Sequence, residues 1–215
     1  MRLLDLQALA DAPLTRDPFM FTVVRDFIRP EARAALQRDF PHIPYPGLLP
    51  VEATQGGPSF TALIEDVRGP AVAQAFSAKL GLDLATRPMM VTVRGQCDIG
   101  DGRIHTDSET KLVTALLYLN DGWNEDGGRL RLLRGPDDLD DMIAEVPPDF
   151  GTLIAFRRSD RSFHGHEPYV GPRRYVMFNW MASGFSAWRE ISRHRLSAMV
   201  KRQFGRTARE EAVDA

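Results

Sequence analysis

The part of this sequence that most restricts its fold is the run from Pro88 to Met181, which predicts a series of short β-strands. Apolar segments rich in β-branched and aromatic residues alternate there with turn-forming clusters of Gly, Asp and Pro. The expected strands lie at residues 89–93, 111–120, 129–133, 152–156 and 175–181. Short strands at such turn-punctuated intervals are typical of a β-sandwich or jelly roll. We therefore expect a mostly β core over about residues 88–182.

The segment Lys111–Asn120, KLVTALLYLN, is the strongest of these strands. Residues 112–119 are apolar at nearly every position, whereas a strand with one solvated face alternates apolar and polar residues. Both faces of this strand are therefore expected to be buried, one in the core and the other as the wall of a pocket.

Helical patterns dominate the chain before this β core. Proline at the first-turn position and apolar residues at helical spacing predict helices at about residues 30–40, 60–67 and 72–80. One strand is expected earlier, at residues 18–24. Residues 1–87 are therefore expected to form mostly helical cover for the β core.

Two further segments flank the expected core. The proline-rich stretch 41–58 predicts an irregular loop or lid. After Gly184, apolar residues fall on one side of a helical wheel and predict a C-terminal helix over about residues 185–204 that docks on the core.

Composition narrows the class of protein. A chain of 215 residues with 43% hydrophobic and 26% charged residues is expected to form a single soluble domain, residues 1–215. A formal net charge of -2 argues against nucleic acid or an anionic membrane as partner. The single cysteine, Cys97, cannot form an intramolecular disulfide and fits a reducing compartment. With no apparent leader or membrane-length apolar run, the cytoplasm is the expected location.

A candidate metal site lies at the centre of the β region. His105 and Asp107 are two positions apart, and on an extended strand residues i and i+2 point to the same face. His164 and His166 are the candidates for a third ligand in the C-terminal half of the β region. Two imidazoles and one carboxylate form the facial set of ligands that is typical of non-haem iron oxygenases.

Several motifs surround these ligands and occur together in one order. They are His105-Thr106-Asp107, Tyr118-Leu119-Asn120 with Trp123, Gly127-Gly128-Arg129-Leu130, Phe156-Arg157-Arg158-Ser159-Asp160, His164-Gly165-His166 and Arg174 through Trp180. In these motifs the chain resembles the 2-oxoglutarate/Fe(II) oxygenases, in the prolyl 4-hydroxylase-like branch. The resemblance covers about half of the chain and implies a double-stranded β-helix (jelly-roll) core. It also implies His105, Asp107 and His164, rather than His166, as the Fe(II) ligands.

The resemblance further implies residues that bind 2-oxoglutarate. The basic residue of the family, about ten positions after the distal histidine, corresponds to Arg174, and a tryptophan follows six positions later at Trp180. Arg174 through Trp180 at alternate positions would then form one pocket wall, with Arg173 facing solvent or pairing with an acid. Tyr118 corresponds to the tyrosine whose hydroxyl reaches the same carboxylate, although an ordinary core tyrosine also fits the pattern.

The implied activity is hydroxylation of an unactivated C–H bond with release of succinate and CO₂. Fe(II) is the implied cofactor, 2-oxoglutarate and O₂ are the co-substrates, and ascorbate is an optional reductant. The implied partner is a peptide, which could be prolyl, or a small molecule. Arg94 departs from the family, which usually has a tyrosine near that position. The alternative is a cupin-like metal-binding protein or 2-oxoglutarate sensor without catalysis.

Overall fold

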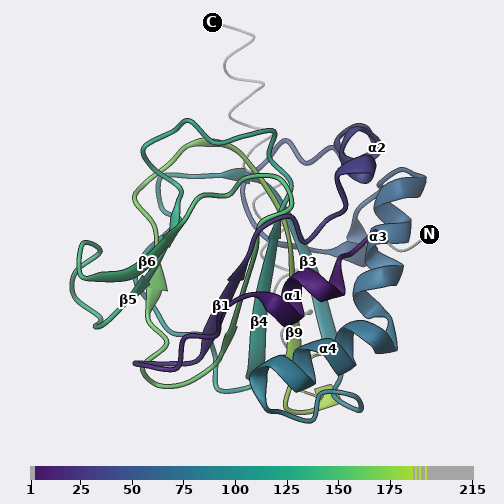
Figure 1. Cartoon of the computed structure of the whole chain (residues 1–215). Helices are drawn as coiled ribbons and strands as arrows, with labels where there is room; N and C mark the ends of the chain where they lie inside the picture. The colour runs from purple at the N-terminus through teal and green to yellow at the C-terminus, as the bar shows by residue number, and fades with distance from the viewer. Residues whose placement is uncertain (1–2, 186, 188, 190–191, 193–215) are drawn as a thin grey trace, which may run out of the picture.

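Two β-sheets face each other, and helices cover the outer face of the larger one (Figure 1). This arrangement is seen in a computed structural model that describes residues 3–185, 187, 189 and 192. The predicted mostly β fold with flanking helices is confirmed. The helix expected at about residues 185–204 lies, apart from a few positions at its start, outside the described residues.

The larger sheet has six strands, all paired antiparallel. In spatial order these are β1 (Phe21–Val24), β7 (Leu153–Arg157), β4 (Lys111–Tyr118), β9 (Gly171–Met181), β3 (Met89–Cys97) and β2 (Leu49–Pro50). Each strand predicted for this sheet is present. The short strand β2 was not predicted, and it forms within the segment that was expected to be an irregular loop.

The smaller sheet has three strands, β6 (Met142–Val146), β5 (Leu130–Leu133) and β8 (His164–Gly165), in that order. Only β5 was predicted from the sequence. The strand β8 has two residues, too few for an alternating pattern to be visible in the sequence. It nevertheless places His164 opposite β5, on the side of the sheet that faces the larger sheet.

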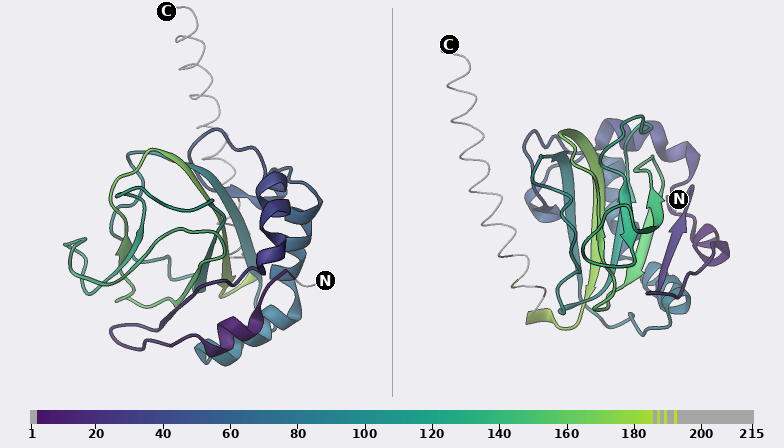
Figure 2. Two further views of the ribbon diagram at one scale, coloured as in Figure 1. Left: turned by 45° about the horizontal axis from the view of Figure 1, so that its top comes forward. Right: turned by 90° about the vertical axis from the view of Figure 1, so that its left-hand side faces the viewer.

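The helices are α1 (Leu6–Asp11), α2 (Arg33–Asp39), α3 (Pro58–Arg68) and α4 (Pro70–Leu80), with single 3₁₀ turns η1 (Pro30–Ala32) and η2 (Val51–Ala53). Both α3 and α4 begin with a proline, which needs no hydrogen bond at that position. The helix α4 ends at Gly81 with φ of 65°, a left-handed conformation that glycine adopts without steric cost. Both helices lie on the side of the larger sheet that faces away from the smaller one (Figure 2).

The larger sheet separates two hydrophobic cores. Residues of β4 and β9 that point to the helices join one core, and those that point to the smaller sheet join the other. Along β4, for example, Ala115 and Leu117 pack on the helix side, whereas Leu116 and Tyr118 pack between the sheets. The prediction that this strand is buried on both faces is confirmed. The space between the two sheets is where the candidate site lies.

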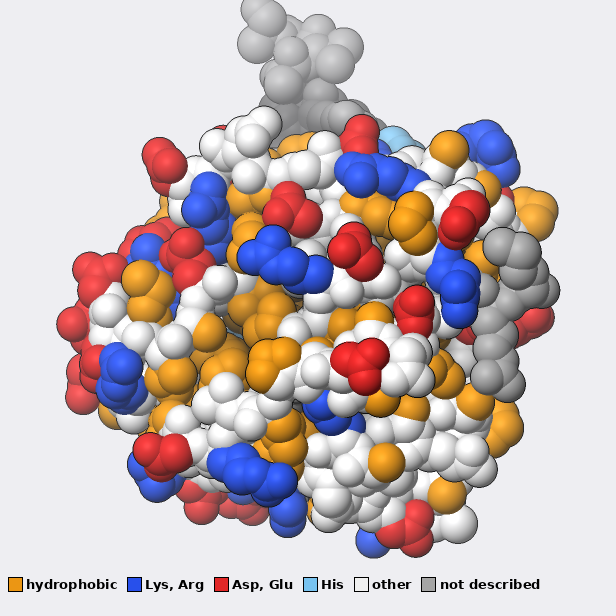
Figure 3. All heavy atoms as spheres, in the orientation of Figure 1, with side chains coloured by type: hydrophobic (Ala, Val, Ile, Leu, Met, Phe, Trp, Pro, Cys, Tyr) orange, Lys and Arg blue, Asp and Glu red, His pale blue; other side chains and the backbone are white. Residues whose placement is uncertain are grey.

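The exterior carries charges of both signs. Figure 3 shows acidic and basic side chains interspersed on one face, with acidic side chains gathered toward the edge that contains β5 and β6. Among the described residues, no helix has both the length and the apolar character needed to cross a membrane.

Candidate metal and co-substrate site

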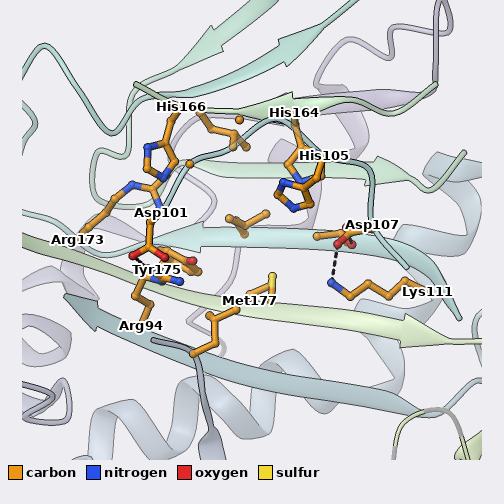
Figure 4. Close-up of a pocket in the computed structure, with 16 residues that line it drawn as sticks. Arg94, Asp101, His105, Asp107, Lys111, His164, His166, Arg173, Tyr175 and Met177 are labelled. Atoms are coloured by element: carbon orange, nitrogen blue, oxygen red, sulfur yellow. Dashed lines mark hydrogen bonds and ion pairs between the residues drawn. The ribbon is translucent and has the colours of Figure 1, made fainter. Parts of the chain in front are cut away.

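Three potential metal ligands meet at the end of the space between the sheets. His105 and His164 lie opposite each other in an antiparallel bridge, with backbone N–H···O distances of 3.1 and 3.0 Å. Asp107 follows two residues later on the same face. One ligand atom from each of these side chains lies within 4.8 Å of the others. Figure 4 shows the three side chains pointing toward one another.

Hydrogen bonds fix which nitrogen each imidazole presents to this meeting point. Nδ1 of His105 lies 2.8 Å from the carbonyl oxygen of Arg103, and Nδ1 of His164 lies 3.0 Å from that of Ser162. A carbonyl oxygen only accepts, so each Nδ1 carries a proton and Nε2 is the nitrogen that remains to bind a metal ion. A second hydrogen bond of this kind is the usual way in which a metal-binding histidine is oriented.

The charge states of the cluster suit a metal ion. Burial lowers the pKa of His164 to about 4, a shift that the nearby Asp107 carboxylate opposes. The imidazole of His164 is therefore neutral at pH 7. Burial raises the pKa of Asp107, but Lys111, His164 and Thr114 outweigh this effect and hold it at about 2. A neutral imidazole beside an ionised carboxylate is the form that binds a cation.

Asp107 is held through both of its carboxylate oxygens. Lys111 Nζ donates to Oδ1 at 2.6 Å, and the Thr114 hydroxyl donates to Oδ2. The amide of Asn179 donates to the Thr114 hydroxyl at 2.8 Å. Thr114 on β4 and Asn179 on β9 are directly paired in the sheet, so the larger sheet itself sets the orientation of the carboxylate.

His166 does not join the cluster. Its Nδ1 donates to the carbonyl oxygen of Glu167 at 2.8 Å, and its Nε2 lies 3.9 Å from Sγ of Cys97. Burial, followed by the positive charge of Arg173, lowers its pKa to about 4. Of the two candidate histidines that the sequence offered, the structure brings His164 to His105 and Asp107 and places His166 elsewhere in the cavity.

A cavity of about 200 Å³ extends from this cluster between the two sheets. Its walls come from β3, β4 and β9 of the larger sheet and from β5 and β8 of the smaller one. The loop between β3 and His105 also contributes, through Asp101 and Gly102. Gly102 has φ of 90°, and a Cβ there would lie 2.4 Å from the carbonyl oxygen of His166, so the loop approaches β8 only because this residue is glycine.

The far end of the cavity contains a buried arginine, Arg173, which is 2% exposed. Its Nε donates to the carbonyl oxygen of Gly128 at 2.8 Å, and its Nη2 donates to the Tyr118 hydroxyl at 3.3 Å. Its guanidinium lies over the rings of Tyr118 and Tyr175, at 5.4 and 5.2 Å from their centroids. Within the described part of the chain, no carboxylate pairs with it. A buried cation without a counter-ion is costly, so an anionic ligand would stabilise this end of the cavity.

The expectation that Arg174 and Trp180 line the pocket is wrong. Arg174 points to the helix side of β9, where Nη1 lies 3.5 Å from Oε1 of Gln37 and the guanidinium covers the ring of Phe40. Trp180, 1% exposed, packs against Phe76 of α4 with ring centroids 4.8 Å apart.

The physical reason is the parity of β9. Its even-numbered residues face the helices, whereas Arg173, Tyr175 and Met177 face the cavity. The expectation that Arg173 faces solvent or pairs with an acid is likewise wrong.

Tyr118 is fully buried at the same end of the cavity, beneath Arg173. Burial raises the pKa of its hydroxyl to about 12, against the opposing effect of Arg173, so the hydroxyl stays protonated at neutral pH. In this structure the hydroxyl contacts the guanidinium of Arg173.

Several residues of the site were not found from the sequence. Lys111 and Thr114 hold Asp107, and Asp101 forms an ion pair with Arg94 inside the cavity. Thr114 is the one polar residue between positions 112 and 117 of an apolar strand. That isolated polar residue was the available signal for a functional role on the pocket face.

Comparisons with known proteins agree with this architecture. Residues 95–182 match the family model of the 2OG-Fe(II) oxygenase superfamily. A prolyl hydroxylase from Trichoplax adhaerens, solved with a peptide fragment of the hypoxia inducible factor oxygen degradation domain, shares the fold. The TM-score is 0.50 with 17% identity, and the match covers 86% of this chain and 90% of that chain.

Two further solved structures are similar at a lower TM-score. A prolyl-4-hydroxylase from Pseudomonas putida has a TM-score of 0.48 and 23% identity, covering 82% of this chain and 90% of that chain. HygX from Streptomyces hygroscopicus, solved with nickel and 2-oxoglutarate bound, has a TM-score of 0.49 and 16% identity, covering 80% and 88%. No curated protein matches the chain. The family match covers the part of the chain that contains His105, Asp107 and His164, and the fold is shared with a prolyl hydroxylase.

Proposed function

We propose that this protein is a hydroxylase in which His105, Asp107 and His164 hold Fe(II) and Arg173 holds the far carboxylate of 2-oxoglutarate. The observation that carries the proposal is the pairing of two features in one cavity. One is a cluster of ligand atoms within 4.8 Å of one another, and the other is a buried arginine without a carboxylate partner among the described residues.

The donor set fits Fe(II). Both histidines present Nε2, and the carboxylate of Asp107 is ionised, so the three residues supply two nitrogen ligands and one oxygen ligand. Such a set leaves coordination positions open for a chelating co-substrate and for O₂.

Arg173 suits the far carboxylate because its remaining amino group, Nη1, has no hydrogen-bond partner among the described residues. The other two nitrogens are held by Gly128 and Tyr118, so the guanidinium is already oriented before any ligand binds. Tyr118 accordingly acts by positioning Arg173. A pre-oriented guanidinium binds a carboxylate with charge-assisted hydrogen bonds at little further entropic cost.

When bound, iron and 2-oxoglutarate supply the oxidising chemistry that inserts one oxygen atom of O₂ into a C–H bond and releases succinate and CO₂. The protein contributes orientation and exclusion of water. Leu116, Leu130 and Met177 line the cavity between the iron ligands and Arg173 and provide an apolar wall. The substrate classes that fit this proposed reaction are a peptide, including one hydroxylated at proline, and a small molecule.

Anaerobic titration of the metal-free protein with Fe(II) and then 2-oxoglutarate tests the proposal. We expect the weak visible charge-transfer band of the iron chelate, followed by succinate formation when O₂ is admitted. If the band forms and no succinate appears with any candidate substrate, the protein binds 2-oxoglutarate without turning it over. If no band forms, the proposal fails.

Two adjacent arginines provide a matched pair of variants. Arg173→Gln removes the guanidinium inside the cavity, and we expect the Kd for 2-oxoglutarate in the band titration to rise by about tenfold or more. Arg174→Gln removes a guanidinium on the opposite face of the same strand and should leave that Kd unchanged. The reverse result would assign the role to Arg174.

A further inference from the structure

A second arginine, Arg94, reaches the cavity from a different strand. It lies on β3 directly opposite Tyr175 of β9, and its side chain is 10% exposed. Figure 4 shows Arg94 and Arg173 on either side of Tyr175, at the end of the cavity away from the iron ligands. Their guanidinium carbons lie 5.9 and 5.2 Å from the centroid of that ring. The cavity therefore has two guanidinium groups, and the proposed function uses one of them.

The hydrogen-bonding capacity of Arg94 is only partly used. Its Nη1 forms an ion pair with Asp101 and lies 3.8 Å from Sγ of Cys97. Its Nε is buried without a hydrogen-bond partner, and Nη2 has none among the described residues. Nε and Nη2 form the edge through which a guanidinium grips a carboxylate with two hydrogen bonds. Leaving a buried donor on that edge unpaired costs free energy that a carboxylate ligand would recover.

The charge balance of the cavity also favours a further carboxylate ligand. Its lining contains three permanent cations, Arg94, Lys111 and Arg173, against two carboxylates, Asp101 and Asp107. Burial opposes the charge of Asp101, but Arg94 outweighs this effect and lowers the pKa of its carboxyl group. Fe(II) and the 2-oxoglutarate dianion cancel each other. The loaded cavity thus keeps one excess positive charge, which one further carboxylate would neutralise.

We propose that the Nε–Nη2 edge of Arg94 binds a carboxylate of the organic substrate, and that the enzyme therefore acts on a small carboxylic acid. This inference rests on the proposed function, since it takes Arg173 as the site of the co-substrate. A small molecule fits better than a polypeptide because Arg94 is only 8% exposed and the cavity holds about 200 Å³. Asp101 then keeps Arg94 in place through Nη1 and leaves the Nε–Nη2 edge to the substrate.

The test compares acids with amides that differ from them only in charge. The probes are N-acetylglycine and N-acetyl-L-proline, each paired with its primary amide. The protein is loaded anaerobically with Fe(II) and saturating 2-oxoglutarate, and each probe is titrated by calorimetry while the chelate band is recorded. We expect the acids to bind about tenfold or more tightly than their amides, as one charge-assisted carboxylate contact would give, with the chelate band retained.

Substitutions then locate the contact. Arg94→Gln should abolish the preference for acids while the Kd for 2-oxoglutarate, read from the chelate band, changes less than about twofold; Arg94→Lys should restore part of the preference. The double variant Arg94→Gln/Asp101→Asn removes both partners of the ion pair and should behave in the same way, which guards against an effect of an unpaired Asp101. Arg87→Gln removes an exposed positive charge outside the cavity lining, and should change nothing.

Three outcomes overturn the inference. If neither acid binds the loaded protein more tightly than its amide, Arg94 does not bind a substrate carboxylate. If Arg94→Gln weakens 2-oxoglutarate as strongly as Arg173→Gln does, Arg94 belongs to the co-substrate site. If the acids bind only by abolishing the chelate band, they compete with 2-oxoglutarate and not for a separate site. Absence of the band in the wild-type protein is a different result, because it removes the proposed function itself.

Discussion

At the residue scale, each proposed iron ligand is oriented by a hydrogen bond to another group of the protein. The carbonyl groups of Arg103 and Ser162 direct the two imidazoles, and the Thr114 hydroxyl directs Asp107. Thr114 lies on the paired strand β4, and Arg103 and Ser162 each precede a bridged histidine by two residues, so the ligands need little rearrangement to bind a metal ion. Metal affinity should therefore depend on the partners as well as on the ligands.

His164 and His166 differ in this respect although they are two residues apart. We expect His164→Ala to lose stoichiometric Fe(II) and His166→Ala to retain it, because only His164 presents a nitrogen to the cluster. Metal analysis of the two purified variants after anaerobic reconstitution decides the question. Iron retained by His164→Ala and lost by His166→Ala would overturn the choice of ligand.

Thr114 offers a test of the supporting hydrogen bond. Thr114→Val keeps the shape of the side chain and removes the hydroxyl that donates to Asp107, so Fe(II) affinity should fall by about tenfold or more. Thr92→Val is the matched control, because Thr92 is also buried on the larger sheet but its hydroxyl contacts the carbonyl oxygen of Met177 and, within the described residues, no metal-ligand side chain. Equal losses of metal affinity in the two variants would show a general effect of burying valine.

At the element scale, one face of β9 lines the cavity and the other packs against the helices. Arg173, Tyr175 and Met177 face the cavity, whereas Val176 and Phe178 pack against the helices. The sequence contains a signal for this division. The odd-numbered face includes polar side chains, while the even-numbered face after position 174 is wholly apolar, as a helix-covered face should be.

The strand β9 also shows which features of the fold and the site can be predicted from the sequence. The spacing of His105 and Asp107, the fold class and the main strands followed from local patterns, because strand periodicity is a local property. The choice between Arg173 and Arg174 depended on a count across the loop that follows β8. Such a count cannot show which of two adjacent residues of β9 faces the cavity, because the register of β9 is set by its pairing with β3 and β4. The pairing of β4 with β9 is also irregular between Lys111 and Val113, next to the ion pair of Lys111 with Asp107, and the sequence pattern does not predict this irregularity.

Trp180 tests the division of β9 into two faces. It packs between Phe76 of α4 and Phe178 on the helix side. Trp180→Ala should lower the free energy of unfolding by about 3–5 kcal/mol through loss of buried surface and creation of a cavity. Urea unfolding measures this loss. At temperatures where the variant stays folded, its Kd for 2-oxoglutarate should match that of the wild type, and a rise as large as that of Arg173→Gln would place Trp180 at the co-substrate.

At the scale of the whole molecule, folding brings together groups that are far apart in the chain and then removes them from water. Asp107 and His164 are separated by 57 positions and meet only when the smaller sheet closes over the larger one. Burial lowers the pKa of both His164 and His166 from 6.5 to about 4. The stability of the metal-free protein should therefore depend on pH in a window defined by these two histidines.

The sign follows from which state binds more protons. Between pH 6.5 and about 4 the unfolded chain binds protons at both histidines while the folded chain does not, so the free energy of unfolding rises with pH across this window. The contribution of these two histidines to the free energy of unfolding is fully present above pH 6.5 and is lost below about pH 4. Urea unfolding in the presence of a chelator, at pH values from 7 to 4.5, should show this decline, and His166→Gln should make it shallower by removing one of the two protons.

Fe(II) should steepen the decline, since protons and metal compete for Nε2 of His164. If the free energy of unfolding of His166→Gln depends on pH as steeply as that of the wild type, then burial and Arg173 do not lower the pKa of His166 in the folded protein.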